Sequence, residues 1–365
     1  MPPGASTAGR RREPEAPGGG PWPGPGEAAR PARQGRLEGR TETLHRYGRS
    51  VDVPSTGQKP SHLATTAEAG PAPLDEGTAR RALMAACSSV GIDATDAELV
   101  RLGENAVFRV PRRDLVARVG RGADRLTRAA RTVAVARWLA VEGVPAIRAL
   151  DVDQPVVADG RVVTFWESID DRPEYGSVVE LAELLRRLHG LSAPAGIDLP
   201  PVAPFEHTRE RINRAPALTV DDRAFLLARW TELAEAYDTL TFELPPGVVH
   251  GDASVGNVIR DREGRPLLAD LDGFAIGPRK WDLVLTALYY EQFGWHTEQE
   301  YRDFAETYGY DVMTWPGYPV LRDVREFLMV VWLSQNSADP KVAEELARRI
   351  SDLRTGASRK DWQPF

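Results

Sequence analysis

Short apolar runs separated by polar turns mark the first folded part of the chain. Three β-like runs follow one another at 98–103, 106–110 and 115–119. The polar turn PRRD at 111–114 joins the last two runs, which predicts a meander of antiparallel strands. Further strands are expected near 147–151 and 161–166, so that the five runs together form one antiparallel sheet.

Two helices are expected beside this sheet. The first spans about 76–91, where Asp75 can act as the N-cap and Gly91 ends the helix. The second spans about 124–142, because its apolar residues recur at helical spacing before Gly143. Residues 73–168 are therefore predicted to form a small N-terminal lobe, made of an antiparallel sheet with one main helix.

Helical spacing dominates the chain after residue 169. In the stretch 176–190, leucines three or four residues apart share one face of a helix. Further helices are expected near 220–239, 280–293, 297–308, 318–336 and 340–355. A polar segment at 248–273 lies between them and is predicted as three strands. Residues 169–365 are thus predicted to be the larger, mainly helical C-terminal lobe of an α+β fold.

Residues 1–72 have the composition of a disordered Pro/Gly-rich tail. Proline and glycine occupy 23 of these 72 positions, and large apolar residues are few and scattered. Burial of so little apolar surface cannot offset the entropy lost on ordering. The segment fits either a genuine tail or a translation start assigned too far upstream.

Composition and charge narrow the class of protein. The chain has 365 residues and a formal net charge of −7. This charge argues against a nucleic-acid-binding protein, since such domains are usually basic. Residues 1–72 have a net charge of +3 and the rest of the chain −10. The acidic remainder either attracts a cationic small molecule weakly or only maintains solubility.

Cys87 is the only cysteine, so no disulfide can form within the chain and a reducing compartment is expected. It lies in an apolar helical stretch, which indicates a core residue and not a nucleophile. No apolar run has the length of a membrane span. We therefore expect a cytoplasmic protein with no membrane partner.

The polar segment contains an ordered set of groups suited to phosphoryl transfer. His250, Gly251 and Asp252 are consecutive, Asn257 follows five residues after Asp252, and Asp270 follows a turn. That reaction needs a positioned hydroxyl, a group that takes its proton, and metal on the phosphate oxygens. Mg²⁺ prefers oxygen ligands, and crowded carboxylates repel each other unless a cation lies between them. Each residue alone would be ordinary in a turn, but the ordered combination predicts a catalytic site with Mg²⁺.

The segments HGDASVGN at 250–257, LLADLDG at 267–273 and WDL at 281–283 resemble the aminoglycoside phosphotransferase family. The resemblance covers most of residues 75–356 and parallels the catalytic and metal-binding motifs of protein kinases. It implies a bilobal protein-kinase-like fold and an ATP-dependent phosphotransferase. By this resemblance Asp252 is the catalytic base, and Asn257 and Asp270 bind Mg²⁺.

The resemblance also implies supporting residues around the catalytic loop. His250 matches a histidine that mainly braces this loop, with proton transfer as the alternative. Asp282 is expected to buttress the loop by hydrogen bonding. Asp272 is expected either to assist the metal or to bind the catalytic loop.

The N-terminal lobe is expected to hold ATP. Gly103 and Asn105 lie at the first strand turn, where the family places a loop over the phosphates, although a plain hairpin fits equally. Arg118 takes the place of the phosphate-binding lysine of kinases, or is a surface residue of an edge strand. Thr132 replaces the glutamate that often pairs with this basic residue. Arg118 must therefore pair with another carboxylate, such as Glu104, or be held less firmly.

Residues 164–168 occupy the expected link between the two lobes. Phe165, Trp166, Glu167 and Ser168 are candidates for contacts with adenine. Backbone groups would bond to the edge of the base, and apolar side chains would cover its faces. The two aromatic residues also fit the core of a strand.

We therefore predict a phosphotransferase with ATP and Mg²⁺ as cofactors and a hydroxyl group of a small molecule as the acceptor. A cationic acceptor is one option, and the protein is expected to be a monomer or a dimer. Two alternatives stay open. The acceptor is a metabolite of the choline, homoserine or sugar type, or the chain is a pseudokinase that binds nucleotide without turnover.

Overall fold

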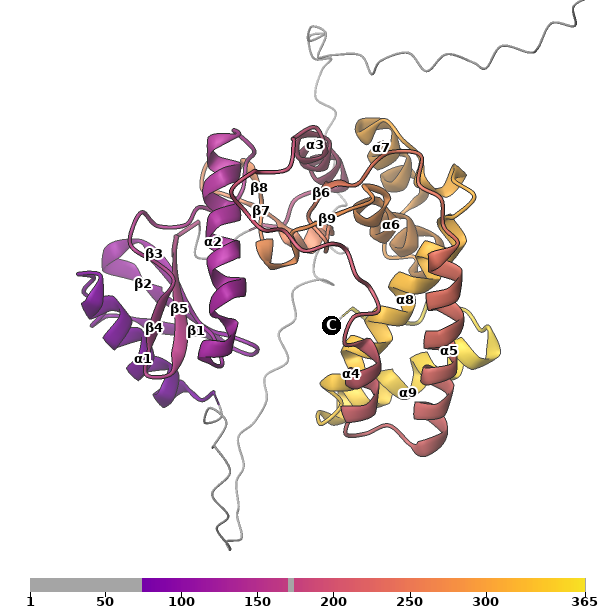
Figure 1. Cartoon of the computed structure of the whole chain (residues 1–365), viewed down its shortest axis with the longest axis horizontal. Coiled ribbons are helices and arrows are strands. Elements are labelled where there is room, and N and C mark those ends of the chain that lie inside the picture. Colours follow the sequence, from indigo (N-terminus) through magenta and orange to yellow (C-terminus); the bar gives the residue numbers. More distant parts are fainter. Residues whose placement is uncertain (1–73, 170–173, 365) are drawn as a thin grey trace, which may run out of the picture. The chain divides into compact units, whose positions relative to one another are not determined.

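A computed structural model describes residues 74–169 and 174–364. The predicted tail at 1–72 therefore lies outside the described residues. The first part of the described chain is a five-stranded antiparallel sheet with the order β1-β2-β3-β5-β4 (Figure 1). Its strands are β1 (Glu98–Leu102), β2 (Ala106–Val110), β3 (Leu115–Val119), β4 (Val156–Ala158) and β5 (Arg161–Glu167). The positions of β1, β2, β3 and β5 confirm the predicted runs.

The strand predicted near 147–151 is wrong. This segment has only two isolated bridges, Ala146 with Leu268 and Ala149 with Trp166. The remaining strand of the sheet is β4, which pairs with β5 across a turn at Asp159 and Gly160, both at positive φ. A two-residue turn of this kind matches the twist of paired strands, so β4 pairs with β5 directly.

Helices make up most of the chain after β5. The helices before β5 are α1 (Glu76–Ser89) and α2 (Leu126–Val141). The helices after it are α3 (Val178–His189), α4 (Thr208–Arg214), α5 (Val220–Asp238), α6 (Lys280–Leu288), α7 (Glu298–Tyr308), α8 (Tyr318–Gln335) and α9 (Pro340–Thr355). All the predicted helices are present, and the one expected at 280–293 is α6 followed by a π-helical turn. The short α4 was not predicted. The α+β class is confirmed.

The helices α1 and α2 cover opposite faces of the sheet, because successive side chains of a strand point to opposite sides. Phe165 packs in the core with α1, whereas its neighbour Trp166 belongs to the core with α2. Arg118 on β3 lies opposite Thr164 in the ladder and therefore shares the α2 face with Trp166. Cys87 is buried on α1, and burial raises the pKa of its thiol to about 11, as fits a core residue.

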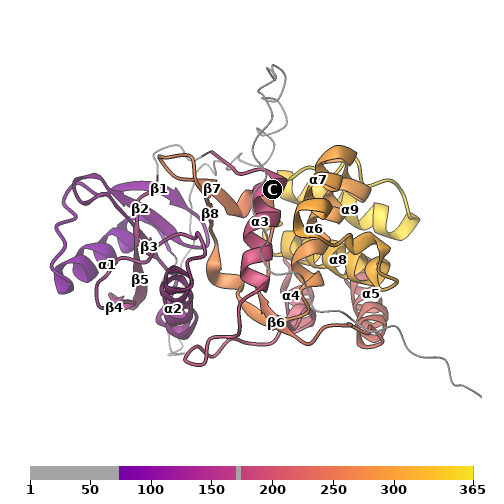
Figure 2. The ribbon, with the colours of Figure 1, turned by 90° about the horizontal axis from the view of Figure 1, so that it is seen from above.

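Two short antiparallel pairs lie within the helical part. The strand β6 (Gly247–Val249) pairs with β9 (Ala275–Gly277), and β7 (Val258–Arg260) pairs with β8 (Pro266–Leu268). Strand β9 was not predicted, because a strand of only three residues shows no alternation of apolar and polar side chains. Figure 2 shows α3 between the β7–β8 pair and the helices α6 and α7. Figure 1 shows α8 among α4, α5 and α9, all of which it contacts.

None of the helices in residues 74–169 and 174–364 is both long and apolar enough to cross a membrane.

The C-terminal residues are part of the helical core, and this yields a stability prediction. Trp362 is fully buried, lies in a tilted arrangement with Phe293 at 5.2 Å between ring centroids, and donates a hydrogen bond to Asp352 at 2.8 Å. We expect Trp362→Ala to lower the free energy of unfolding by about 3–5 kcal/mol, because it leaves a cavity. Urea unfolding followed by far-ultraviolet circular dichroism measures this change.

Trp332 provides the matched control, since it is 45% exposed on α8. Trp332→Ala should change the free energy of unfolding by no more than about 0.5 kcal/mol. Equal losses in the two variants would contradict the packing described for the C-terminal residues.

Candidate active site

Strand pairing brings the predicted catalytic and metal-binding residues together. Strand β6 leads directly into His250, and the following loop ends at Asn257, where β7 begins. Val258 pairs with Leu268, and the backbone N–H of Ala269 donates to the carbonyl of Asn257 at 2.9 Å. Asn257 and Asp270 therefore stand at the same end of the β7–β8 pair, beside the loop that holds Asp252.

The two loops touch through their backbones, and glycine makes this contact possible. Gly251 has a φ of +88°, and a Cβ atom placed on it would lie 2.1 Å from the carbonyl oxygen of Gly273. No side chain fits there, and left-handed backbone of this kind favours glycine. The Asp252 loop and the Asp270 loop are consequently in direct contact.

Asp282 holds the start of the predicted catalytic loop, residues 250–257. Its carboxylate is fully buried and accepts hydrogen bonds from the backbone N–H groups of His250 at 2.6 Å and Gly251 at 2.9 Å. The Nε2 atom of His189 lies 3.0 Å from the same carboxylate. Burial alone would raise the pKa of Asp282, but the hydrogen bond and charge of His189, with those of His250, outweigh it and lower the pKa. The carboxylate is therefore ionised and fixes two consecutive residues of the loop.

His250 connects the catalytic loop to strand β8. Its ring is fully buried, and Nε2 donates to the carbonyl of Ala269 at 2.9 Å. This contact lies one residue before Asp270, so the histidine links the two loops. A bracing role follows from this geometry more readily than proton transfer does.

Asp252 projects from this fixed loop into solvent, with 61% of its side chain exposed. Its Oδ1 atom accepts from Nη2 of Arg325 at 2.9 Å. Asn257 donates to the carbonyl of Asp252 at 2.8 Å and lies 3.4 Å from Oδ2. Since the Asn257 amide nitrogen bonds within the loop, its amide oxygen remains as an oxygen donor for a ligand.

Asp270 occupies a strained and electrostatically unfavourable position. Its φ of 51° is left-handed, which is uncommon for a residue other than glycine and is often found at functional sites. The side chain reaches solvent but is otherwise closely surrounded by protein. This burial, followed by the charge of Asp272, raises the pKa of Asp270, and Arg118 and His250 oppose the rise.

A cation beside Asp270 and Asp272 would relieve this repulsion. The oxygen donors here are a carboxylate and an amide, which suit Mg²⁺. Within residues 74–169 and 174–364, no group of three or more histidine, cysteine or acidic side chains is arranged to bind a metal. A metal at this position would therefore take phosphate or water oxygens as further ligands.

Thr132 makes a contact that the sequence did not reveal. Its hydroxyl lies 2.8 Å from Oδ1 of Asp272, and the Nε atom of Arg128 lies 4.0 Å from Oδ2. Helix α2 is thus tied directly to the segment that follows Asp270. Neither Arg118 nor Glu104 has an ion pair among the described residues, so the pairing considered between them is not present.

A pocket beside α2 contains several of the residues expected to bind nucleotide. Three arginines face it, and its lining includes Glu104, Asn105, Arg118, Gly120, Arg125, Arg128, Thr132, Thr164, Trp166 and Asp272. The guanidinium of Arg118 lies 5.4 Å from the centre of the Trp166 ring. Gly103 lies at the turn next to this pocket, where its N–H donates to the carbonyl of Asn105.

The residues proposed for adenine binding are only partly in place. Phe165 points into the core on the α1 side, away from Trp166 and the pocket. The backbone N–H of Glu167 donates to Arg148, and that of Ser168 donates to Asp114. Successive strand residues face opposite sides, so only one of the two aromatic residues can line the pocket.

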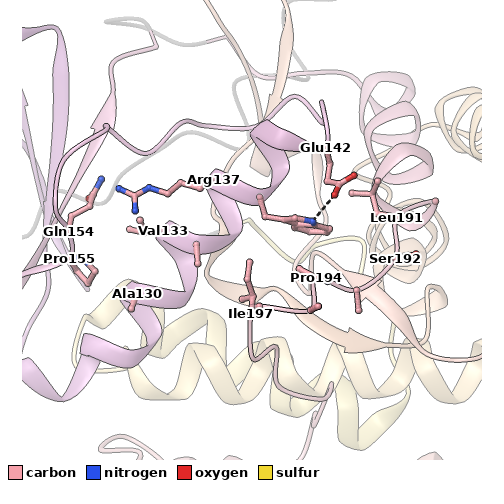
Figure 3. A pocket seen from close by; sticks show the side chains of 16 residues that line it. Ala130, Val133, Arg137, Glu142, Gln154, Pro155, Leu191, Ser192, Pro194 and Ile197 are labelled. Carbon is pink, nitrogen blue, oxygen red and sulfur yellow. Dashed lines mark hydrogen bonds between the residues drawn. The ribbon is translucent and has the colours of Figure 1, made fainter.

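A second hollow lies on the other side of α2 (Figure 3). It is lined by α2 residues such as Arg137, by the loop at 154–155 and by residues 190–197. Arg137 donates to the carbonyl of Val152, and Glu142 accepts from the Trp138 ring. None of the predicted site residues is among its lining residues, whereas Asn105, Arg118 and Trp166 line the pocket beside Asp272, so that pocket remains the candidate for the nucleotide.

A known protein family matches more than half of this chain. The sequence profile of the phosphotransferase enzyme family matches residues 99–324. A search of curated proteins found no match.

Solved structures of related fold include two that resemble this chain over most of its length. Amicoumacin kinase, solved with AMP-PNP and Ca²⁺, is 14% identical, with a TM-score of 0.58, and the alignment covers 74% of this chain and 91% of that one. Spectinomycin phosphotransferase, solved with ADP, is 16% identical, with a TM-score of 0.52 and coverages of 71% and 85%. These similarities confirm the protein-kinase-like fold.

The family match at residues 99–324 includes most of the sheet, the loops that hold Asp252 and Asp270, and the beginning of α8. The chain therefore belongs to the phosphotransferase enzyme family, and it is a phosphotransferase with the fold of small-molecule kinases.

Proposed function

We propose that the protein transfers the γ-phosphoryl group of ATP directly to a hydroxyl group of a small molecule. The observation that carries this proposal is the placement of Asp252, Asn257 and Asp270 on two loops in backbone contact. Asp282 and His250 hold those loops together by buried hydrogen bonds. Phosphoryl transfer depends mainly on such positioning and on electrostatic stabilisation.

Residues 73–168 bind the nucleotide in this proposal, and residues 169–365 bind the acceptor. Arg118, Arg125 and Arg128 line one pocket, where their charges suit the phosphates of ATP. Asn105 and the turn at Gly103 lie beside the phosphates, and Trp166 lies beside the base or the ribose. The engaged N–H groups of Glu167 and Ser168 limit their part in adenine binding to their carbonyl groups and side chains.

Asn257 and Asp270 hold Mg²⁺ in this proposal, through the amide oxygen and the carboxylate. When bound, the ion supplies positive charge to the β- and γ-phosphate oxygens and relieves the repulsion among the nearby carboxylates. Asp272 keeps α2 next to this site through Thr132. The AMP-PNP and Ca²⁺ in the structure of amicoumacin kinase support the use of a nucleotide and a divalent cation.

Asp252 acts as the base. It orients the acceptor hydroxyl, whose oxygen attacks the γ-phosphorus in line with the departing ADP, and the hydroxyl proton passes to the carboxylate. No covalent enzyme intermediate is required, because the acceptor itself receives the phosphoryl group.

The names of the two relatives support an antibiotic acceptor, and a metabolite acceptor stays as the alternative. The net charge of −10 outside residues 1–72 favours a cationic or neutral acceptor. The use of ATP and the single cysteine favour the cytoplasm. A monomer or a dimer is compatible with direct transfer within one chain.

Replacement of the base is the first test. We expect Asp252→Asn to lower phosphoryl transfer by about 10²–10⁴-fold, because the proton has no acceptor. Binding of Mg²⁺·ATP should change little, as measured by calorimetric titration beside an assay of ADP release. Asp303→Asn, on α7, is the control and should leave both quantities unchanged. A fully active Asp252→Asn enzyme would exclude this residue as the base.

The metal site predicts a dependence of nucleotide binding on Mg²⁺. We expect ADP to raise the melting temperature of the wild type more with Mg²⁺ than with a chelator, since the ion binds with the nucleotide to the native state. In Asp270→Asn this difference should shrink or disappear. An undiminished difference in that variant would assign the metal to other residues.

The bond between Thr132 and Asp272 predicts a role for the hydroxyl group at position 132. Thr132→Val removes this bond at nearly constant volume and should lower kcat by about 3–10-fold, through a less fixed α2. Thr132→Ser keeps the hydroxyl and should stay near the wild type. A measurable turnover in the wild type also decides against the pseudokinase alternative, which only Thr132 supported.

A further inference from the structure

Arg325 is a buried arginine at the catalytic loop that the sequence did not single out. It lies on α8, 73 residues after Asp252, and only 8% of its surface is exposed. Its Nη2 atom donates to Oδ1 of Asp252 at 2.9 Å, and its Nη1 atom donates to the carbonyl of Gly251 at 3.3 Å. One planar group therefore bonds to both the backbone and the side chain of the loop.

The guanidinium is itself held in place by Trp281. Its carbon lies 4.6 Å from the centre of the Trp281 ring, which is a favourable contact between a cation and an aromatic face. The ring nitrogen of Trp281 donates to the same carbonyl of Gly251, at 2.8 Å. Trp281 and Asp282 are neighbours in the first turn of α6. This turn therefore binds both a carbonyl group and backbone N–H groups of the loop.

The contacts of Arg325 distinguish the two oxygens of the Asp252 carboxylate. Oδ1 accepts from Arg325 at 2.9 Å, whereas the nearest donor to Oδ2 is the Asn257 amide at 3.4 Å. A carboxylate with one oxygen bonded strongly cannot rotate freely. The other oxygen then faces solvent in a fixed direction, where a hydroxyl group can approach it.

Stabilisation of the fold is a weak explanation for this ion pair. Asp252 is 61% exposed, and ion pairs with an exposed partner contribute little to folding. The Nε atom of Arg325 is buried with no hydrogen-bond partner among the described residues. An unpaired polar atom of this kind makes burial of the side chain less favourable in free energy. Asp252 is also the only carboxylate that forms an ion pair with Arg325 in residues 74–169 and 174–364.

Other charged residues of α8 are directed elsewhere. Arg322 binds Glu291 at 3.1 Å and Asp323 at 2.9 Å, and Glu326 binds Arg359 at 2.9 Å. The charges within each of these pairs neutralise one another, and none of the pairs includes Asp252. Arg325 alone among them joins α8 to the proposed base.

We propose that Arg325 is a positioning residue for Asp252. Its guanidinium fixes the carboxylate through Oδ1 and leaves Oδ2 to receive the proton of the acceptor hydroxyl. This inference rests on the proposed role of Asp252 as the base. Its consequence is that loss of Arg325 affects the chemical step and leaves nucleotide binding in place.

We expect the wild type to hydrolyse Mg²⁺·ATP slowly, with water in place of the acceptor, and this reaction provides the test. We expect Arg325→Met to lower kcat for ADP release by about 10–100-fold, because the base loses its orientation. The KM for ATP should change by less than about threefold, since Arg325 lies outside the nucleotide pocket. Arg325→Lys keeps the charge and should recover part of the loss. Millimolar guanidinium should raise the rate of Arg325→Ala and leave that of Asp252→Ala unchanged.

Arg322→Met is the matched control, because Arg322 is another partly buried arginine of α8 with ion pairs and an aromatic contact. It should keep the kcat of the wild type even if its melting temperature falls. If Arg325→Met behaves in the same way, the positioning role is wrong. If Asp252→Asn hydrolyses ATP at the wild-type rate, the proposed role of Asp252 as the base fails, and the inference fails with it.

Discussion

The candidate site depends on a buried carboxylate that has no contact with solvent. Asp282 accepts hydrogen bonds from two consecutive backbone amides and lies next to His189, so its charge is compensated in a region that excludes water. A buried charge without such partners is strongly destabilising, commonly by about 3–5 kcal/mol when one partner is removed. The same interactions that make this burial tolerable therefore fix the main chain just before Asp252. The rigidity of the catalytic loop follows from electrostatics within the core.

From this fixed point the remaining contacts extend to parts of the chain that are distant in sequence. His250 bonds to the carbonyl before Asp270, and Gly251 allows the backbone of the second loop to approach. Thr132 joins α2 to Asp272, and Arg325 joins α8 to Asp252. Residues from the sheet part and the helical part thus converge on two loops. In the proposed mechanism, a shift in any of these elements would move a group that takes part in phosphoryl transfer, a reaction that depends mainly on positioning.

Much of the fold could be read from local patterns. Caps such as Asp75, the polar turn at 111–114 and the regular spacing of leucines act within a few residues, so they predicted most helices and four strands of the sheet. The errors were in short elements. Strand β9 has three residues, and the N-cap of α4, His207, is in a left-handed conformation and makes no capping hydrogen bond with its side chain. Such elements exist because neighbouring parts of the chain pair with them, and their own sequences do not specify them.

The amino-acid sequence alone specifies which chemical groups occur in which order: an aspartate, an asparagine five residues later and a second aspartate after a hairpin. Order along the chain was sufficient because the β7–β8 pair is local and brings its two ends together. The partners of these groups follow from the packing of distant elements. This packing places Arg325 at Asp252, Thr132 at Asp272, and Phe165 on the far face of the sheet. Contacts between residues 73 or 140 positions apart depend on how whole elements pack, and no local pattern of side chains encodes that packing.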